Sequence, residues 1–384
     1  GGRCRAPGWC AAALVPRSAV ARAAGAAGAT GAWQVRLPEQ PQPCPSSLDG
    51  KVARASKRLA KLQRAGDRGD PAVLAARDAL VTLLEAAGEQ DKAEQLCRGG
   101  LADREAAAGP RHAGTLVAMR RLGLLLQVLG RLEEAEQLLL AAADGLGGEA
   151  GRRASEELAA LLKQKGRYSR AEPLLRASLH EREQEQGATH PHTLAALDSL
   201  ASCLQALGKH TEAEPLSRRA AMGRAKELGE AHAETLRSFS SLATLLAAMG
   251  RYPEAEDLHR RALKGIEATL GSEHPATCAE LSNFALLLKA TGRYKESELL
   301  YRRALEARTA TLGPGHPHTL TIVSNFAILL KTTGRYEEAE RLLRHVLECR
   351  TVALGAQHPD TWTSTNNLAV LLVTVGRPAE AEPF

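Results

Sequence analysis

Residues 316–355 contain the pattern that decides the fold of this chain. The segment reads HPHTLTIVSNFAILLKTTGRYEEAERLLRHVLECRTVALG, and Gly334 and Gly355 end its two halves. Apolar residues follow helical spacing before Gly334, and a second helical run opens with Glu-Ala-Glu just after it. Glycine suits the left-handed backbone position that often ends a helix. The segment therefore predicts two helices joined by a short turn.

This helical pair recurs along most of the chain. Its first glycine returns every 42 residues, except for one interval of 36 residues after Gly130. These repeat glycines are Gly88, Gly130, Gly166, Gly208, Gly250, Gly292, Gly334 and Gly376. A second glycine follows each of the first seven by 21 residues, at Gly109, Gly151, Gly187, Gly229, Gly271, Gly313 and Gly355. A fixed period indicates a repeat array, so we expect about eight antiparallel helical pairs over residues 70–384, the last one truncated.

The pairs are separated by a His-Pro-x-Thr segment, clear in four repeats and weaker elsewhere. Six of the twelve histidines occupy its first position: His112, His190, His232, His274, His316 and His358. Proline disfavours helix in the residue before it, and threonine can cap the next helix or lie in its first turn. A structural role is sufficient to explain these histidines.

The repeat with the 36-residue interval keeps Gly151 but lacks the whole His-Pro-x-Thr segment. Six residues are therefore missing there. We expect a shortened loop and a truncated first helix that starts near Arg153, with a local change in stacking. A neutral deletion is an equally good explanation of the gap.

The formal charge of +6 is concentrated at one end of the chain. Residues 1–70 hold 12 Lys and Arg against 4 Asp and Glu, whereas the remaining residues hold 38 against 40. Residues 1–50, rich in Ala, Gly, Arg and Pro, are expected to form a disordered leader, although 1–38 also resembles an organelle transit peptide. Residues 51–69 predict a basic helix or linker, most simply docked on the first repeat. Because the chain begins with Gly1 and ends inside a repeat, we expect it to be a fragment.

Several classes of protein are disfavoured by what the sequence lacks. No apolar run approaches the roughly 18 residues needed to span a membrane, so membrane insertion is not expected. Seven scattered cysteines without a C-x-x-C pair indicate reduced thiols in a cytosol-like compartment. The pairs His190-x-His192 and His316-x-His318 have no third ligand nearby, so we expect no metal site. No catalytic or phosphate-binding motif occurs, and we expect neither an enzyme nor a cofactor.

Nucleic-acid binding through the repeats is also not expected, despite the basic leader. Only 3% of the residues are aromatic, and four of the five tyrosines stand two residues after a repeat glycine, where packing accounts for them. A platform that stacks single-stranded bases needs exposed aromatic side chains among basic ones.

The repeat resembles the tetratricopeptide repeat, and its 42-residue form looks like that of kinesin light chain. The resemblance is carried by Ser324 to Leu330, by Gly334-Arg335-Tyr336, by Glu338-Ala339-Glu340 and by Leu312-Gly313. Similar arrays occur in nephrocystin-like proteins and in the sensor arms of nucleotide-binding switch proteins. Two features of those relatives are missing here: the long heptad coiled coil of kinesin light chains and the phosphate loop of the switch proteins.

The resemblance implies an all-α, right-handed superhelix whose first helices line a concave groove that binds peptide segments. It also implies a cytoplasmic, cytoskeleton-associated adaptor whose partners are kinesin heavy chain and cargo. Two alternatives remain open at this point. The array could be the sensor or oligomerisation arm of a nucleotide-binding switch protein, or a structural scaffold that assembles with copies of itself.

The candidate site residues lie at matching positions of the first helices. The positions nine before the repeat glycines are Ala79, Arg121, Glu157, Ser199, Ser241, Asn283, Asn325 and Asn367. The resemblance implies that asparagine at this position holds the backbone of an extended peptide, and an amide offers both donors and an acceptor. Lys289 and Lys331, three residues before their glycines, favour an acidic peptide or a free carboxylate. The alternative is that both lysines are solvated surface residues.

Overall fold

The computed structural model describes residues 45–67 and 69–382, and all regular secondary structure in these ranges is helical. The expected leader falls outside them as far as residue 44. The chain divides into two compact units, an N-terminal unit, Gly1–Glu181, and a C-terminal unit, Arg182–Phe384. Within the described ranges, no helix is both long enough and apolar enough to cross a membrane.

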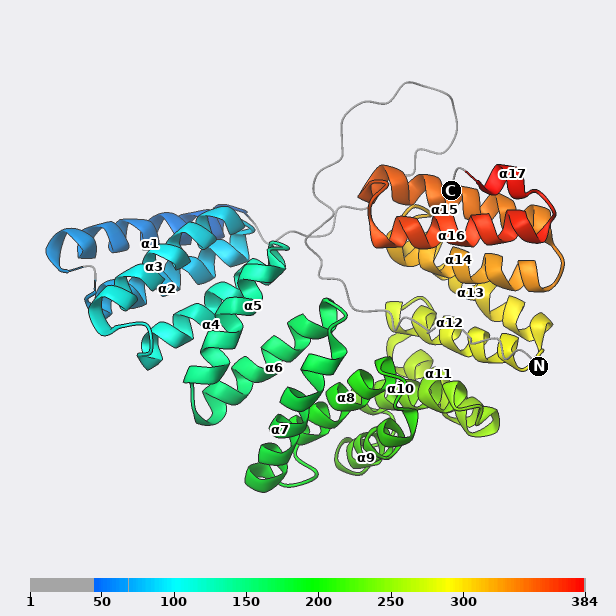
Figure 1. Ribbon diagram of the computed structural model, residues 1–384, viewed down its shortest axis with the longest axis horizontal. Helices are drawn as coiled ribbons and strands as arrows, with labels where there is room; N and C mark the ends of the chain where they lie inside the picture. The colour runs from blue at the N-terminus through cyan, green and yellow to red at the C-terminus, as the bar shows by residue number, and fades with distance from the viewer. Residues whose placement is uncertain (1–44, 68, 383–384) are drawn as a thin grey trace, which may run out of the picture. The chain divides into compact units, whose positions relative to one another are not determined.

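The helices follow one another as antiparallel pairs within each unit (Figure 1). The N-terminal unit contains α1 (Pro45–Ala65), α2 (Pro71–Ala87), α3 (Gln90–Ala108), α4 (Ala113–Val128), α5 (Leu132–Gly145), α6 (Gly148–Gln164) and most of α7 (Tyr168–Gln186). The C-terminal unit contains α8 (Pro191–Ala206), α9 (His210–Leu228), α10 (Ala233–Ala248), α11 (Tyr252–Leu270), α12 (Pro275–Ala290), α13 (Tyr294–Leu312), α14 (Pro317–Thr332), α15 (Tyr336–Leu354), α16 (Pro359–Thr374) and α17 (Pro378–Ala381). Even-numbered helices are the first helices of their pairs, and odd-numbered helices from α3 onward are the second helices.

The repeat glycines end the helices because of their backbone conformation. Gly334, in the turn between α14 and α15, has φ of +79°, and Gly355 after α15 has φ of +88°. L-residues with a side chain rarely adopt such angles. Of the fifteen glycines that the repeat pattern singles out, all except Gly151 have positive φ.

The repeat with the 36-residue interval is shortened in its second helix, and the prediction of a truncated first helix near Arg153 is wrong. The second helix α5 has 14 residues, against 19 in α3, and only two residues separate α5 from α6. The first helix α6 keeps 17 residues and begins at Gly148, where φ is +59°. Gly151 lies inside α6, where a Cβ atom would stand 2.2 Å from the carbonyl oxygen of Leu146. Glycine is required there by the close approach of the shortened loop.

Three cations around one carboxylate join the short repeat to the next repeat. Glu136 of α5 is 7% exposed and accepts hydrogen bonds from Lys165, from Arg167 at 2.9 Å and from Arg170 at 2.6 Å. Burial would raise the pKa of Glu136, but the hydrogen bonds from Lys165 and Arg170 outweigh it and lower the pKa. The ionised carboxylate therefore links α5 to the start of α7 through ion pairs.

The basic helix α1 begins at Pro45, inside the segment expected as leader, and packs on the first helical pair. Leu59 is buried against Val73 and Leu80 of α2, with Val52 and Leu62 partly buried beside it. The cationic side chains of α1 are exposed on the rest of its surface: Lys51, Arg54, Lys57, Arg58, Lys61 and Arg64. The helix covers the apolar face of α2, as a terminal cap does in a repeat protein.

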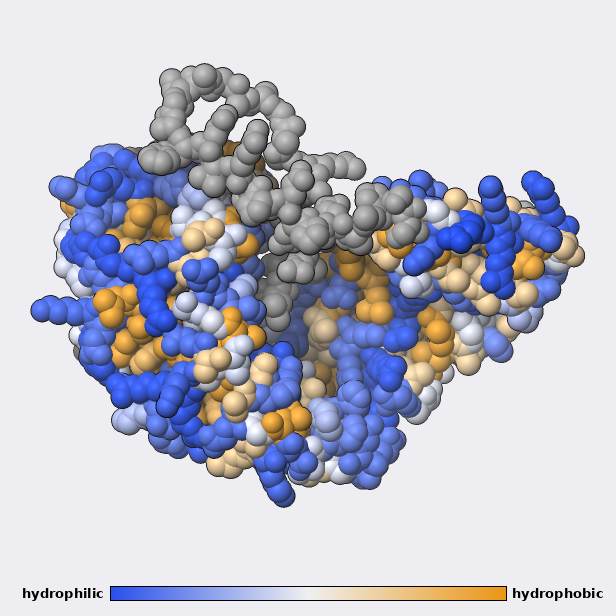
Figure 2. Space-filling model, turned by 180° about the vertical axis from the view of Figure 1, so that it is seen from behind, coloured by the Kyte–Doolittle hydropathy of each residue, from blue (hydrophilic) through white to orange (hydrophobic). Residues whose placement is uncertain are grey.

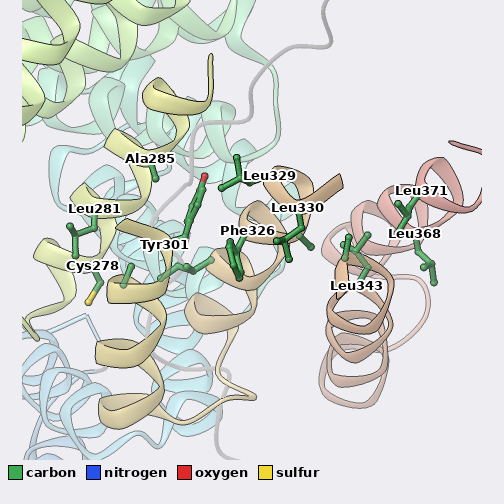
Figure 3. Packing of buried hydrophobic residues seen from close by; sticks show 14 of the residues in the cluster. Cys278, Leu281, Ala285, Tyr301, Phe326, Leu329, Leu330, Leu343, Leu368 and Leu371 are labelled. Atoms are coloured by element: carbon green, nitrogen blue, oxygen red, sulfur yellow. The ribbon is translucent and has the colours of Figure 1, made fainter. Parts of the chain in front are cut away.

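The core of the C-terminal unit is made by the predicted apolar positions. Leu281 and Ala285 of α12 are fully buried, and Tyr301 of α13 and Phe326 of α14 pack beside them (Figure 3). The rings of Tyr301 and Phe326 lie 6.0 Å apart between centroids. Each helix therefore contacts the next one along the chain, and this cluster of buried residues extends across neighbouring repeats from α12 to α16.

Candidate functional site

The predicted site residues lie on successive first helices of the C-terminal unit. The helices α10, α12, α14 and α16 contact one another in order. They carry Ser241, Asn283, Asn325 and Asn367 at the predicted position, with Lys289 and Lys331 further along α12 and α14. Except for the exposed Ser241, these side chains are partly buried. We call these six residues the candidate face.

The polar groups of the candidate face have no partner within the part of the chain that the structure describes. None of the three asparagine amides and neither lysine ammonium makes a hydrogen bond or ion pair with another described residue. Ser199, on α8, differs because it already interacts with another residue. The predicted polar groups from α10 to α16 are thus without partners among the described residues, whereas Ser199 has one.

Lys289 lies in a positive environment. Burial lowers its pKa first, and the charge of Lys331 on the next first helix lowers it further. Two ammonium groups on adjacent helices therefore repel each other. A carboxylate placed near both would relieve this repulsion.

Contacts in the N-terminal unit show which positions face one another across neighbouring first helices. Arg121, nine before its glycine, donates to Thr82 Oγ1 at 2.8 Å and to Glu85 Oε2 at 3.1 Å. Thr82 and Glu85 stand six and three residues before Gly88. By the same register, we expect the amide of Asn325 to lie opposite the position of Lys289.

On the first helices of the N-terminal unit, charged side chains at and beside the matching positions form ion pairs with one another. Arg121 pairs with Glu85, and Arg120 donates to Glu157 Oε1 at 2.7 Å. Glu157 is itself the residue nine before its glycine. Charged side chains thus occupy two of the three matching positions in the N-terminal unit and pair across first helices, although Oε2 of Glu157 has no partner among the described residues.

Two buried serines beside the candidate face were not identified by the sequence pattern. Ser282 and Ser324 precede Asn283 and Asn325, are 7% and 6% exposed, and their hydroxyls have no partner among the described residues. The equivalent Ser240 donates to Glu280 on the next first helix. The position ten before each glycine therefore points toward a neighbouring helix, which spacing along one helix could not reveal.

Other features of the described residues are weaker candidates for a functional site. A cavity of about 420 Å³ between α1, α2 and α3 is lined half by leucine and valine and half by polar residues, of which Lys92 pairs with Glu89 at 2.6 Å. Among the described residues, no group of three His, Cys, Asp or Glu side chains is arranged to hold a metal ion. On the surface shown in Figure 2, hydrophobic residues lie in small groups between hydrophilic ones. Unpaired polar groups, rather than hydropathy, mark the candidate face.

Comparison with known proteins agrees with this architecture. A tetratricopeptide repeat model matches residues 152–224, 200–268, 233–310, 278–351 and 318–384, and a second such model matches residues 73–114. The chain belongs to the tetratricopeptide repeat family. The predicted all-α tetratricopeptide solenoid is confirmed, and repeats of this family indicate a protein-interaction scaffold. No curated protein matches the chain.

Several solved structures are similar to this tetratricopeptide protein. Kinesin light chain-like repeats of Podosopora anserina are 29% identical over 52% of this chain and 94% of their own, with a TM-score of 0.47. The quorum sensor NprR of B. thuringiensis in its apo form is 13% identical over 89% of this chain and 97% of its own, with a TM-score of 0.58. A signal-transduction ATPase of Pyrococcus horikoshii with a tetratricopeptide sensor is 14% identical over 86% of this chain and 50% of its own, with a TM-score of 0.48.

Proposed function

We propose that this tetratricopeptide protein is a non-enzymatic scaffold that binds an extended acidic peptide on the candidate face. The observation that carries the proposal is the contrast between the two units. The N-terminal unit pairs its own charged groups across first helices, whereas Asn283, Asn325, Asn367, Lys289 and Lys331 have no partner among the described residues. Partly buried polar groups without partners gain most from a ligand that supplies hydrogen bonds.

The chemistry of the candidate face suits a peptide with carboxylate side chains. Each amide can donate to a peptide carbonyl and accept from a peptide N–H. The lysine ammoniums add charge attraction for an acidic side chain or a chain terminus. By its likeness to repeats of the kinesin light chain type, we further propose a cytoplasmic adaptor with kinesin heavy chain and cargo as its partners.

Binding of acidic 12-residue peptides on an array tests the candidate face. We expect Asn283→Ala with Asn325→Ala to weaken capture of the best acidic peptides about tenfold or more, because the loss of each good hydrogen bond costs about 1 kcal/mol. Peptides with Glu replaced by Gln should lose affinity for the wild-type chain. Lys289→Ala with Lys331→Ala should remove that preference for acid.

The matched control is Lys264→Ala with Lys295→Ala, which removes the same charge from exposed positions on the second helices α11 and α13. This control should bind like wild type, and circular dichroism should show the same helix content for all variants. Unchanged peptide capture by the asparagine double variant would contradict the assignment.

A further inference from the structure

Six first helices begin with the same unusual cap, a histidine side chain. In each case the Nδ1 atom lies 3.1 to 3.3 Å from the backbone nitrogen two residues later and accepts its hydrogen bond. The cap histidines are His112 on α4, His190 on α8, His232 on α10, His274 on α12, His316 on α14 and His358 on α16. They are six of the twelve histidines of the chain.

The predicted threonine has another role in the same turn. Thr277 Oγ1 donates to the carbonyl oxygen of Gly271 at 2.6 Å, and Thr361 Oγ1 donates to that of Gly355 at 2.8 Å. Threonine therefore ties the first turn of the helix to the preceding glycine. The acceptor for the free backbone N–H comes from histidine alone.

Such a cap works only while the imidazole is neutral. The backbone N–H is a donor, so Nδ1 must present a lone pair, and an imidazolium has protons on both ring nitrogens. Protonation would remove the acceptor and place a positive charge at the positive end of the helix dipole. Protonation of any of these imidazoles would therefore break its cap.

Charged groups of both signs lie around the caps, and Oδ2 of Asp360 stands 3.9 Å from Nδ1 of His358. Buried arginines of second helices reach these turns: Arg350 of the preceding helix α15 donates to the Asp360 carbonyl at 3.0 Å, and Arg308 of the following helix α13 donates to the Pro275 carbonyl at 3.1 Å. Burial first, then the charges of His318 and Arg308, lower the pKa of His316. The charged and titratable groups at the caps of the C-terminal unit are Arg182 and His192 at His190, Arg224 and Glu234 at His232, Glu273 and Arg308 at His274, Arg308 and His318 at His316, and Arg350 and Asp360 at His358.

Two other first helices of the chain begin without a histidine cap and allow a comparison. The first helix of the first repeat, α2, is capped by Asp70, whose Oδ1 accepts from the Ala72 backbone nitrogen at 2.7 Å. A carboxylate cap stays ionised well below neutral pH. The short repeat has no side-chain cap at α6. Among the side-chain caps of the described first helices, only histidine is a residue type whose ordinary pKa lies between pH 5.5 and 7.5.

We propose that the six histidines form a proton-sensitive set of helix caps, which lowers the stability of the repeat array when the pH falls below about 6.5. A histidine that stays neutral in the folded state binds its proton more readily in the unfolded chain. Stability is therefore full above the unfolded-state pKa of about 6.5 and is lost as the pH falls below it. Each cap changes the unfolding constant by up to about tenfold per pH unit in that range.

The caps stand at the ends of the helices that carry the candidate face. His274, His316 and His358 cap α12, α14 and α16, which present the three asparagines. Acidification should therefore loosen this face and release a peptide bound there. This corollary rests on the proposed function, whereas the effect on stability does not.

Thermal unfolding of the full chain at pH 7.5 and 5.5, followed by circular dichroism, tests the proposal. The variant replaces all six cap histidines by asparagine, an effective cap that does not titrate. We expect the melting temperature of the wild type to fall between the two pH values and that of the variant to lose less than half as much. An equal loss in both proteins would overturn the proposal.

The control variant is His192→Asn with His345→Asn, which removes two exposed histidines that cap no helix. It should keep the pH response of the wild type, and a response as weak as that of the six-fold variant would count against the caps.

A single variant, His316→Asn, provides a second readout if the six-fold variant does not fold. Hydrogen exchange of the His318 amide, corrected for its intrinsic pH dependence, should speed up at pH 5.5 in wild type but not in His316→Asn. Equal protection of this amide at both pH values in wild type would contradict the proposal.

Discussion

His259 and Tyr301 stand at the same position, nine residues after their repeat glycines, but their polar atoms have different surroundings. Nδ1 of His259 lies 2.6 Å from Oε1 of Glu280, and both side chains are almost fully buried. The residue that matches Glu280 in the next repeat is Ile322, and the buried hydroxyl of Tyr301 has no partner among the described residues. One position thus holds a satisfied polar group in one repeat and an unsatisfied one in the next.

Substitution by phenylalanine at these two positions should have opposite effects. Tyr301→Phe removes an unsatisfied hydroxyl, and we expect the free energy of unfolding to stay the same or rise by about 1 kcal/mol. His259→Phe leaves the buried Glu280 carboxylate without its imidazole partner and should cost about 3 kcal/mol. Urea midpoints of the two variants measure the difference, and a loss of stability in Tyr301→Phe would show that its hydroxyl has a partner.

At the scale of the element, the junction between the short repeat and the next one is distinguished by its cluster of cations. Other repeats place an apolar residue or threonine just before the repeat glycine, but this one has Lys165, which joins Arg167 and Arg170 around Glu136. The Arg167–Glu136 pair corresponds to the pair that Arg335 makes with Glu298 in a regular repeat, and Lys165 and Arg170 are two further cations around the same carboxylate.

Glu136→Gln should therefore destabilise the N-terminal unit. We expect a loss of about 2 kcal/mol, below the value for a fully buried ion pair because Arg167 and Arg170 are partly exposed. The pKa of Glu136 is lowered in the folded state, so its contribution is present above the unfolded-state pKa of about 4.3 and is lost as the pH falls below it. Urea unfolding at pH 7 and pH 3.5 should show the difference between wild type and variant shrinking at the lower pH.

At the scale of the whole molecule, the net charge is localised rather than spread. Arginines of the second helices pair with glutamates one turn away, as Arg302 does with Glu298 at 2.8 Å and Arg344 with Glu340 at 2.7 Å. Regular pairs also join adjacent repeats, because Arg335 reaches Glu298 of the previous repeat and Glu338 of its own. On α1, by contrast, no ion pair joins the cations to a described carboxylate.

Polyanion binding should follow this local imbalance. We expect Arg54→Gln, Arg58→Gln and Arg64→Gln together to lower the salt concentration at which the full chain elutes from heparin, because exposed unpaired cations interact most strongly with a polyanion. The control replaces Arg260, Arg302 and Arg344 by Gln, which changes net charge equally but removes cations that are already paired. Equal shifts for both triple variants would mean that net charge alone controls retention.

The sequence by itself determined the helical pairs, their number and most of their ends. Glycines such as Gly334 and the apolar spacing before them act within one or two helical turns, so they can be interpreted without knowing what lies opposite. The same local logic placed the asparagines and lysines of the candidate face on first helices.

Only the tertiary structure decided what each polar group meets. Histidine rather than threonine caps the first helices, since the carbonyl of the preceding glycine takes the threonine hydroxyl. The missing residues came from α5, because the close approach at Gly151 lets α6 keep its length. Arg121 is paired and Asn325 is not, although both stand at the same position, because pairing depends on the side chain opposite on the next helix. That neighbour lies about one repeat away in the sequence, beyond the reach of a local pattern.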